Sequence, residues 1–318
     1  PMAIGSALRA LPGPFAAALA LAACTPAAAP PPPPPPPVVA APRPDAPPPS
    51  AESLALRAYY ASVQRELLAQ GMLRTDGGGP DTPFTDRMLA ANFTRIALYD
   101  EYTRTAQGGL VARESESRLR RWEGPVRVAL KFGASVPPER QATDRARVGS
   151  YLARLSRITG HPIALVDQGA NFDVWIVDET ERRALGPVVR AALPGLTAAD
   201  VAGLIGLPRS TYCIVYAMSE GSDSRYRRAF AVIRAEHPDL LRLACLQEEI
   251  AQGLGLANDS PAARPSIFND DEEFALLTRQ DELMLRMLYD PRLRTGMTAA
   301  EARSIVEDIA ASLVGGDS

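Results

Sequence analysis

The chain of 318 residues contains only two histidines, His161 and His237, and only three cysteines. Two histidines cannot supply the three imidazole ligands found in many catalytic zinc sites. The 34 basic residues are nearly balanced by 37 acidic residues, so the formal charge is only -3. Because this balance leaves no excess of basic residues of the kind that binds nucleic acids, we expect no nucleic-acid partner.

The first 23 residues have the features of a bacterial signal peptide. Arg9 precedes an Ala- and Leu-rich stretch that ends at Leu21-Ala22-Ala23-Cys24. This stretch is too short and too marked by proline to span a bilayer. Its end resembles the lipobox of bacterial lipoproteins, in which cleavage exposes a cysteine that carries the lipid. The alternative is an ordinary signal peptide in which the cysteine occurs by chance. We predict that residues 1–23 are removed and that Cys24 is lipidated.

Residues 24–50 read as a spacer between this anchor and a folded unit. They consist mainly of Ala and Pro, with residues 30–37 all proline. Such a run adopts extended polyproline II and spans roughly 60–80 Å at about 3.1 Å per residue. Thr25 after the cysteine, in place of Asp, suggests sorting to the outer membrane, facing the periplasm. The sequence therefore predicts a lipid-anchored protein of the cell envelope.

Cys213 and Cys245 are the cysteines that remain after lipidation. In an oxidising envelope such a pair is expected to form one disulfide. A catalytic cysteine is the alternative, but no histidine is near Cys245 in the sequence. We therefore predict a disulfide between the two.

Alternating strand patterns and helical periodicities predict an α+β fold. Residues 51–123 read as a helical segment that begins with a hairpin of two helices, 52–70 and about 88–99. Residues 124–315 read as a domain of strands followed by helices. The expected strands are 126–132, 163–166, 172–177, 212–218 and 229–233. The expected helices of this domain are 139–158, a short one after Thr197, 239–254, about 272–289 and 299–313.

The segment from Glu248 to Asp259 follows the frame of an extended zinc-peptidase motif, H-E-x-x-H-x-x-G-x-x-H. In that motif, histidines one helical turn apart bind zinc, and the glutamate is the general base. The glycine lets the chain turn so that a third histidine reaches the metal. Here the ligand positions hold Glu248, Gln252 and Asn258, while Glu249 and Gly255 keep the types of the base and the turn.

Further segments resemble the metzincin peptidases. Ser266-Ile267-Phe268 lies where those enzymes have a Ser-Ile-Met turn, and 277–289 is similar to their closing helix. The strands before the motif also fit the order of a zincin N-terminal subdomain. Through residues 247–260 and 288–297 the chain is identified as resembling domain of unknown function 2927. The members of that bacterial family look like zincins with altered ligands, and the resemblance implies no established activity.

The expected helix 239–254, which carries the start of the motif, also has a simpler interpretation. Leu243, Leu246, Ile250 and Leu254 would form the buried stripe of an amphipathic helix. Glu248, Glu249 and Gln252 would then belong to a solvated polar face.

The chemistry of the ligand positions argues against a zinc cofactor. One carboxylate and two amides make a poor zinc site. A hard cation such as Ca²⁺ is an alternative occupant, with Glu248, Asn258 and Asp259 as oxygen ligands.

We expect a pseudo-metallopeptidase that binds a peptide or an envelope protein in an inherited cleft lined by Glu248, Gln252 and Asn258. Zincin clefts hold extended peptides against an edge strand, and this interaction does not need the metal. The alternatives are a hydrolase that uses Glu249 with a non-standard metal or none, and a purely structural envelope lipoprotein.

Overall fold

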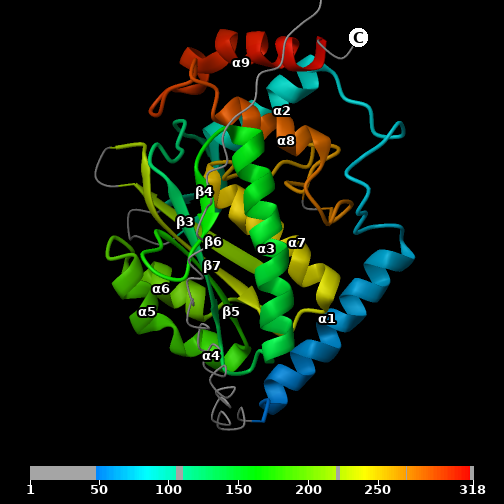
Figure 1. Cartoon of the computed structure of the whole chain (residues 1–318), viewed down its shortest axis with the longest axis vertical. Coiled ribbons are helices and arrows are strands. Elements are labelled where there is room, and N and C mark those ends of the chain that lie inside the picture. Colours follow the sequence, from blue (N-terminus) through cyan, green and yellow to red (C-terminus); the bar gives the residue numbers. More distant parts are fainter. Residues whose placement is uncertain (1–47, 105–109, 220–222, 270, 316–318) are drawn as a thin grey trace, which may run out of the picture. The chain divides into compact units, whose positions relative to one another are not determined.

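A computed structural model describes residues 48–104, 110–219, 223–269 and 271–315 (Figure 1). The predicted signal peptide, Cys24 and most of the predicted spacer lie outside the described residues. Within the described part of the chain, no helix is both long and apolar enough to cross a membrane.

The centre of the fold is a mixed sheet of five strands in the order β4-β3-β5-β7-β6. The strands are β3 (Val126–Phe132), β4 (Ile163–Leu165), β5 (Phe172–Val177), β6 (Cys213–Ser219) and β7 (Tyr226–Arg234). β4, β3, β5 and β7 pair in parallel, whereas β6 runs antiparallel to β7 and forms one edge. This sheet confirms the predicted α+β fold, and each strand lies within a few residues of its expected position.

Helices cover both faces of the sheet (Figure 1). α3 (Pro138–Thr159) and α7 (Asp239–Leu254) pack on one face, and α4 (Glu179–Ala184), α5 (Gly186–Ala192) and α6 (Ala198–Ile205) lie toward the other. Successive side chains of a strand point to opposite faces. Accordingly, Ala231 and Ile233 of β7 join the core beneath α3 and α7, whereas Phe230 and Val232 join the core beneath α5 and α6. The sequence patterns did not predict α4 or α5.

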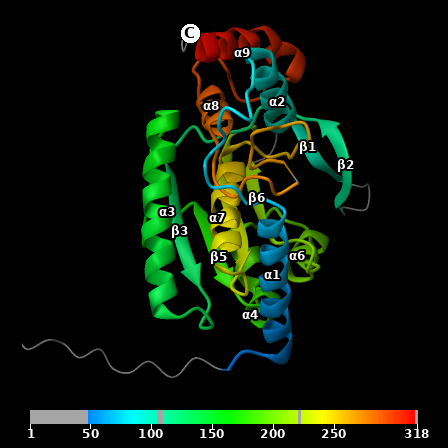
Figure 2. The ribbon, with the colours of Figure 1, turned by 90° about the vertical axis from the view of Figure 1, so that its right-hand side faces the viewer.

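The two N-terminal helices do not form the predicted hairpin. α1 (Ala51–Ala69) contacts α4, whereas α2 (Asp86–Leu98) packs against α8 (Arg279–Leu288) and α9 (Ala299–Val314). Figure 2 shows α2 grouped with α8 and α9, away from α1. The reason is the buried face of α2, where Leu89, Phe93 and Ile96 join the main core.

A two-stranded antiparallel hairpin, β1 (Tyr99–Arg104) and β2 (Leu110–Glu116), follows α2 where only helix was expected. α8 is also shorter than the predicted 272–289. It begins after Thr278, whose side chain accepts a hydrogen bond from the Asp281 N–H in a capping box, so the residues before Thr278 are not part of the helix.

Candidate functional site

Helix α7 carries the motif and lies directly on the sheet. It begins after β7, and Leu246, Ile250 and Leu254 of its buried side belong to the main core. A Cβ on Gly253 would lie 2.5 Å from the Phe172 ring of β5, so only a glycine allows this close approach. The position of α7 is therefore fixed tightly against the strands.

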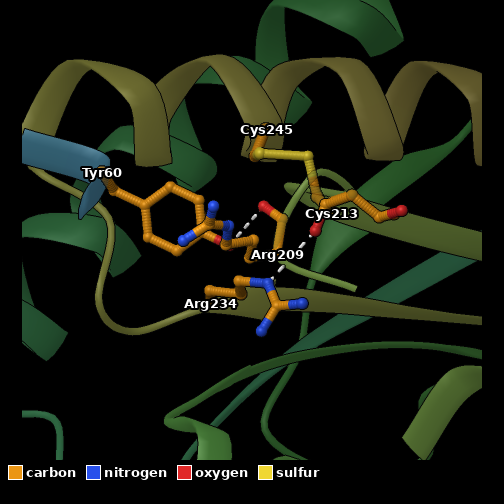
Figure 3. Close-up of a disulfide and its surroundings, with 6 residues drawn as sticks. Tyr60, Arg209, Cys213, Arg234 and Cys245 are labelled. Atoms are coloured by element: carbon orange, nitrogen blue, oxygen red, sulfur yellow. Dashed lines mark hydrogen bonds between the residues drawn. A yellow bond between two sulfur atoms is a disulfide. The ribbon is translucent and has the colours of Figure 1, made fainter. Parts of the chain in front are cut away.

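The predicted disulfide is confirmed and ties α7 to the edge strand. Cys213 and Cys245 are joined with a Cα–Cα distance of 5.9 Å. Figure 3 shows the bond running from β6 to the helix above it. The edge strand and the motif helix are thus covalently linked.

Gly255 makes the turn that the motif requires. Its φ of +131° is disfavoured for residues with a side chain, and an added Cβ would lie 2.4 Å from the Arg120 carbonyl oxygen. The last carbonyl groups of α7 are bound by two aromatic side chains. Trp122 Nε1 donates to the Gly253 oxygen at 2.8 Å, and the Tyr289 hydroxyl donates to the Leu254 oxygen at 3.1 Å. The sequence did not indicate the role of Trp122.

The motif residues on either side of Gly255 are linked to each other and to α2. Gln252 Nε2 donates to Asp259 Oδ1 at 3.0 Å. Asn258 Nδ2 donates to the Arg95 carbonyl oxygen at 3.0 Å, and the Asn258 backbone N–H donates to the Ile96 oxygen at 3.1 Å. The end of α2 therefore holds the third ligand position.

The two glutamates of the motif differ in exposure. Glu249 is buried, with 4% of its surface accessible, whereas Glu248 and Gln252 are partly exposed. A solvated polar face is therefore the wrong interpretation for Glu249. Leu243 is also only partly buried, although the amphipathic pattern placed it in the buried stripe.

The Ser266-Ile267-Phe268 segment lies beside the motif and is fixed by a buried carboxylate. The Ser260 N–H, two residues after Asn258, donates to the Phe268 oxygen at 2.8 Å. Asp281 accepts from Ser266 Oγ at 2.6 Å and from the Ile267 N–H at 3.1 Å. Burial raises the pKa of Asp281 to about 6, although these hydrogen bonds oppose the shift.

Asp281 was not among the predicted site residues. Its signal was present in the sequence as Thr278-x-x-Asp281, a capping pattern at a helix start.

The residues at the ligand positions do not fit a zinc ion. Zinc sites in proteins use imidazole, thiolate or carboxylate groups, and amide oxygens bind zinc weakly. Here both amides use their N–H groups in hydrogen bonds that fix the turn. Within the described residues, no group of three or more His, Cys, Asp or Glu side chains is placed to hold a metal ion.

A pocket of about 740 Å³ lies at the C-terminal end of β6. It is lined from β6 by Ala217, Met218 and Ser219 and from the chain after β2 by Ser117, Arg118 and Arg120. Glu248, Glu249, Gln252, Asn258 and Asp259 are not among its lining residues. The sequence did not point to this pocket, because its walls come from segments about 100 residues apart.

The profile of one protein family, described as Protein of unknown function (DUF2927), matches residues 86–308. This span contains the five-stranded sheet, α7 and α8, whereas α1 lies outside it. No curated protein and no solved structure matches the chain. Because the match covers well over half of the chain, the protein belongs to the DUF2927 family.

Proposed function

We propose that this protein is a lipid-anchored pseudo-metallopeptidase of the cell envelope that binds an extended peptide, or an extended segment of an envelope protein, along strand β6. The observation that carries the proposal is the position of β6. It is the terminal, antiparallel strand of the sheet, and all seven of its residues are partly exposed.

An edge strand of this kind can pair with an added strand. Main-chain hydrogen bonds then provide affinity, and pockets for alternate side chains provide specificity. The pocket at the C-terminal end of β6 lies where a paired peptide would extend past Ser219. The disulfide from Cys213 to Cys245 holds the strand against α7, so the docking edge is rigid.

The zincin part of the proposal is supported by topology and by the turn. The chain passes from the antiparallel edge strand β6 to β7 and then directly into α7, the order expected of a zincin sheet and motif helix. Gly255 supplies the sharp turn at the motif position. The substituted ligand positions support binding rather than zinc-dependent hydrolysis.

The envelope location is supported by two independent features. The sequence around Cys24 resembles a lipobox. The disulfide is of a type that persists in oxidising compartments and is rare in the bacterial cytosol.

Site-specific photo-crosslinking in cells tests the binding surface. A photo-crosslinking amino acid at Ala217 of β6 should capture one envelope protein through a defined segment, identified by sequencing the crosslinked peptide. The same substitution at Val188, which is 37% exposed on α5, is the matched control and should not capture it. Identical adducts from both positions, or none from Ala217, would contradict the proposal. The Cys24→Ala variant should lose both the lipid and the adduct.

Two measurements on the purified full chain separate the binding protein from an enzyme. Stoichiometric zinc in the protein as isolated would exclude a pseudoenzyme. Peptide hydrolysis that is abolished by Glu249→Gln would instead establish a hydrolase with Glu249 as general base. We expect neither result.

A further inference from the structure

A group of buried charged residues lies at the carboxyl ends of β5 and β7, away from the motif. We name it the basal cluster; it consists of Glu179, Arg182, Arg234, Glu236 and His237. Glu179 is paired with Arg182 at 2.6 Å and with Arg234 at 2.7 Å. Charged groups are rarely buried unless they are paired, and these pairs satisfy that rule.

His237 is the exception in the basal cluster. Its side chain is fully buried, and neither ring nitrogen has a hydrogen-bond partner among the described residues. The Tyr60 ring of α1 packs edge-on against the imidazole at a centroid distance of 4.5 Å, and Tyr212 packs at 6.0 Å. The imidazole therefore lies beneath α1 in an environment that suits only its neutral form.

Helix α1 covers the basal cluster through two side-chain hydrogen bonds and through the Tyr60 ring. Ser53 Oγ donates to Glu236 Oε1 at 2.7 Å, and the Tyr60 hydroxyl donates to the Arg209 oxygen at 2.9 Å. Of the α1 side chains only Ser53 and Tyr60 are buried, while Leu54 is 53% exposed and Leu68 47% exposed. The apolar contacts of α1 belong to a small cluster, separate from the main core, to which the helix contributes Leu56, Tyr60 and Leu67. We therefore expect α1 to be held less firmly than the helices of the main core.

The same helix completes the start of α7. The residue before α7 is Pro238, which provides no side-chain cap. Gln64 of α1 supplies one, because its Oε1 accepts a hydrogen bond from the Leu241 N–H at 3.0 Å. Displacement of α1 would leave this N–H of the motif helix without its cap.

We propose that α1 is a pH-gated strap, which docks over the neutral His237 ring and is released when that imidazole is protonated. In sequence, α1 directly follows the proline-rich spacer, and it lies outside the family match. The strap would therefore couple the acidity around the protein to the segment next to its predicted anchor and to the start of the motif helix.

The positive charges near His237 oppose its protonation. Arg234 of β7 and Arg242 of α7 act on the imidazole directly, and the Arg242 side chain also donates to the His237 carbonyl oxygen at 3.2 Å. Arg57 of α1 and Arg140 of α3 add positive charge to the same region. Together with burial, the two nearest arginines hold the pKa of His237 well below its usual range.

The carboxylates of this region are largely engaged elsewhere. Glu179 of α4 binds Arg182 and Arg234, and Asp144 of α3 binds Arg242 at 3.1 Å. Glu236 Oε1 accepts from Ser53 and from the Glu179 N–H, and burial raises the pKa of Glu236, so this carboxyl is a weak counter-charge. An imidazolium at His237 would therefore need water, which release of α1 would admit.

The direction of the pH effect follows from proton linkage. The docked state keeps His237 neutral, whereas release of α1 exposes the imidazole to water and raises its pKa toward the ordinary value of about 6.5, with Arg234 and Arg242 still beside it. Release therefore takes up a proton, and docking weakens as the pH falls from about 6.5. Between about pH 7.5 and about pH 5.5 the docking equilibrium should shift several-fold toward release, with about tenfold as the limit for one group whose pKa after release is about 6.5.

Hydrogen exchange of the full chain in detergent tests this proposal. Exchange rates for the amides of α1 and of α9 are each divided by the intrinsic rate at the same pH. Protection of α1 should fall several-fold, with about tenfold as the limit, between about pH 7.5 and about pH 5.5, while protection of α9 stays constant. In His237→Phe the fall should disappear. His161→Gln removes the only other histidine and should leave the fall unchanged. An α1 protection that is independent of pH, or one that falls equally in His237→Phe, would overturn the proposal.

A second measurement needs no change at His237. The chain has only two histidines, so its imidazole proton resonances are assigned by comparison with His161→Gln. The His237 resonance should titrate together with the loss of α1 protection. Titration of His237 while α1 remains fully protected would refute the strap even if His237→Phe does not fold.

Discussion

Gln252 donates a hydrogen bond to Asp259 across 3.0 Å, and this contact joins helix α7 to the chain that follows the Gly255 turn. In the zinc-peptidase motif that the segment resembles, a metal ion joins the same two stretches of chain. Here a side-chain hydrogen bond, together with the bond from Asn258 to the Arg95 carbonyl group, holds the turn closed. The geometry of the turn is thus kept without metal ligands of the usual kind.

Introducing histidines at the three ligand positions tests whether the scaffold is that of a zincin. The combined variant Glu248→His, Gln252→His, Asn258→His should bind one zinc ion per chain, because α7 and the Gly255 turn would then present three imidazole groups. Metal analysis after dialysis and the absorption spectrum of the cobalt form measure this. Gln252→His alone is the control and should retain no metal. A folded triple variant that retains no zinc would contradict the zincin interpretation.

The Gly255 turn should tolerate no side chain. Gly255→Ala places a Cβ 2.4 Å from the Arg120 oxygen at a φ of +131°. We expect a loss of at least about 2 kcal/mol in the free energy of unfolding, from the clash and the disfavoured backbone together. Gly124→Ala, where no atom lies within 4 Å of the added Cβ, is the matched control and should change stability by less than about 0.5 kcal/mol. Denaturant unfolding of both variants measures this, and equal losses would contradict the role of Gly255.

The parts of the site that could be predicted from the sequence are those determined by residues that are close together in the sequence. Helix α7 occupies residues 239–254 as expected, because its apolar periodicity and the glycine after it are local signals. The Cys213–Cys245 pair was also predictable, since few cysteines remained to choose from.

Other features depend on contacts that no local pattern records. The bond from Asn258 to Arg95 joins residues 163 positions apart, and the bond from Ser53 of α1 to Glu236 joins residues 183 positions apart. Leu54 of α1 is 53% exposed, whereas the neighbouring Ser53 is buried against Glu236. The buried side of α1 thus combines a polar contact with the apolar cluster around Tyr60.

The disulfide should contribute strongly to stability. It closes a loop between residues 32 positions apart, and the chain-entropy model gives about 3–4 kcal/mol for such a loop. The double variant Cys213→Ser, Cys245→Ser should therefore unfold at a markedly lower denaturant concentration. Unfolding curves of the full chain with and without reductant measure the effect. If reduction left the midpoint unchanged, the bond between β6 and α7 would not be a stabilising cross-link.

Asp281 should impose a pH dependence of its own on folding. Its pKa is raised to about 6 in the folded protein by burial, against an ordinary value of 3.8. A carboxyl with a raised pKa binds a proton more readily when folded, so its stabilising contribution is present at low pH and is lost as the pH rises through about 6. The loss between about pH 4 and about pH 7 should be on the order of 3 kcal/mol.

Asp281→Asn separates this contribution from those of other groups. An asparagine resembles the protonated carboxyl and can still accept hydrogen bonds from the Ile267 and Thr278 N–H groups, but it does not titrate. The stability of the native protein minus that of the variant should therefore fall as the pH is raised from about 4 to about 7. Other titrating groups, His237 included, are present in both proteins and cancel in the difference. A difference that stays constant across this range would mean that Asp281 is already ionised at low pH, and that the turn at Ser266 is held by a charged carboxylate.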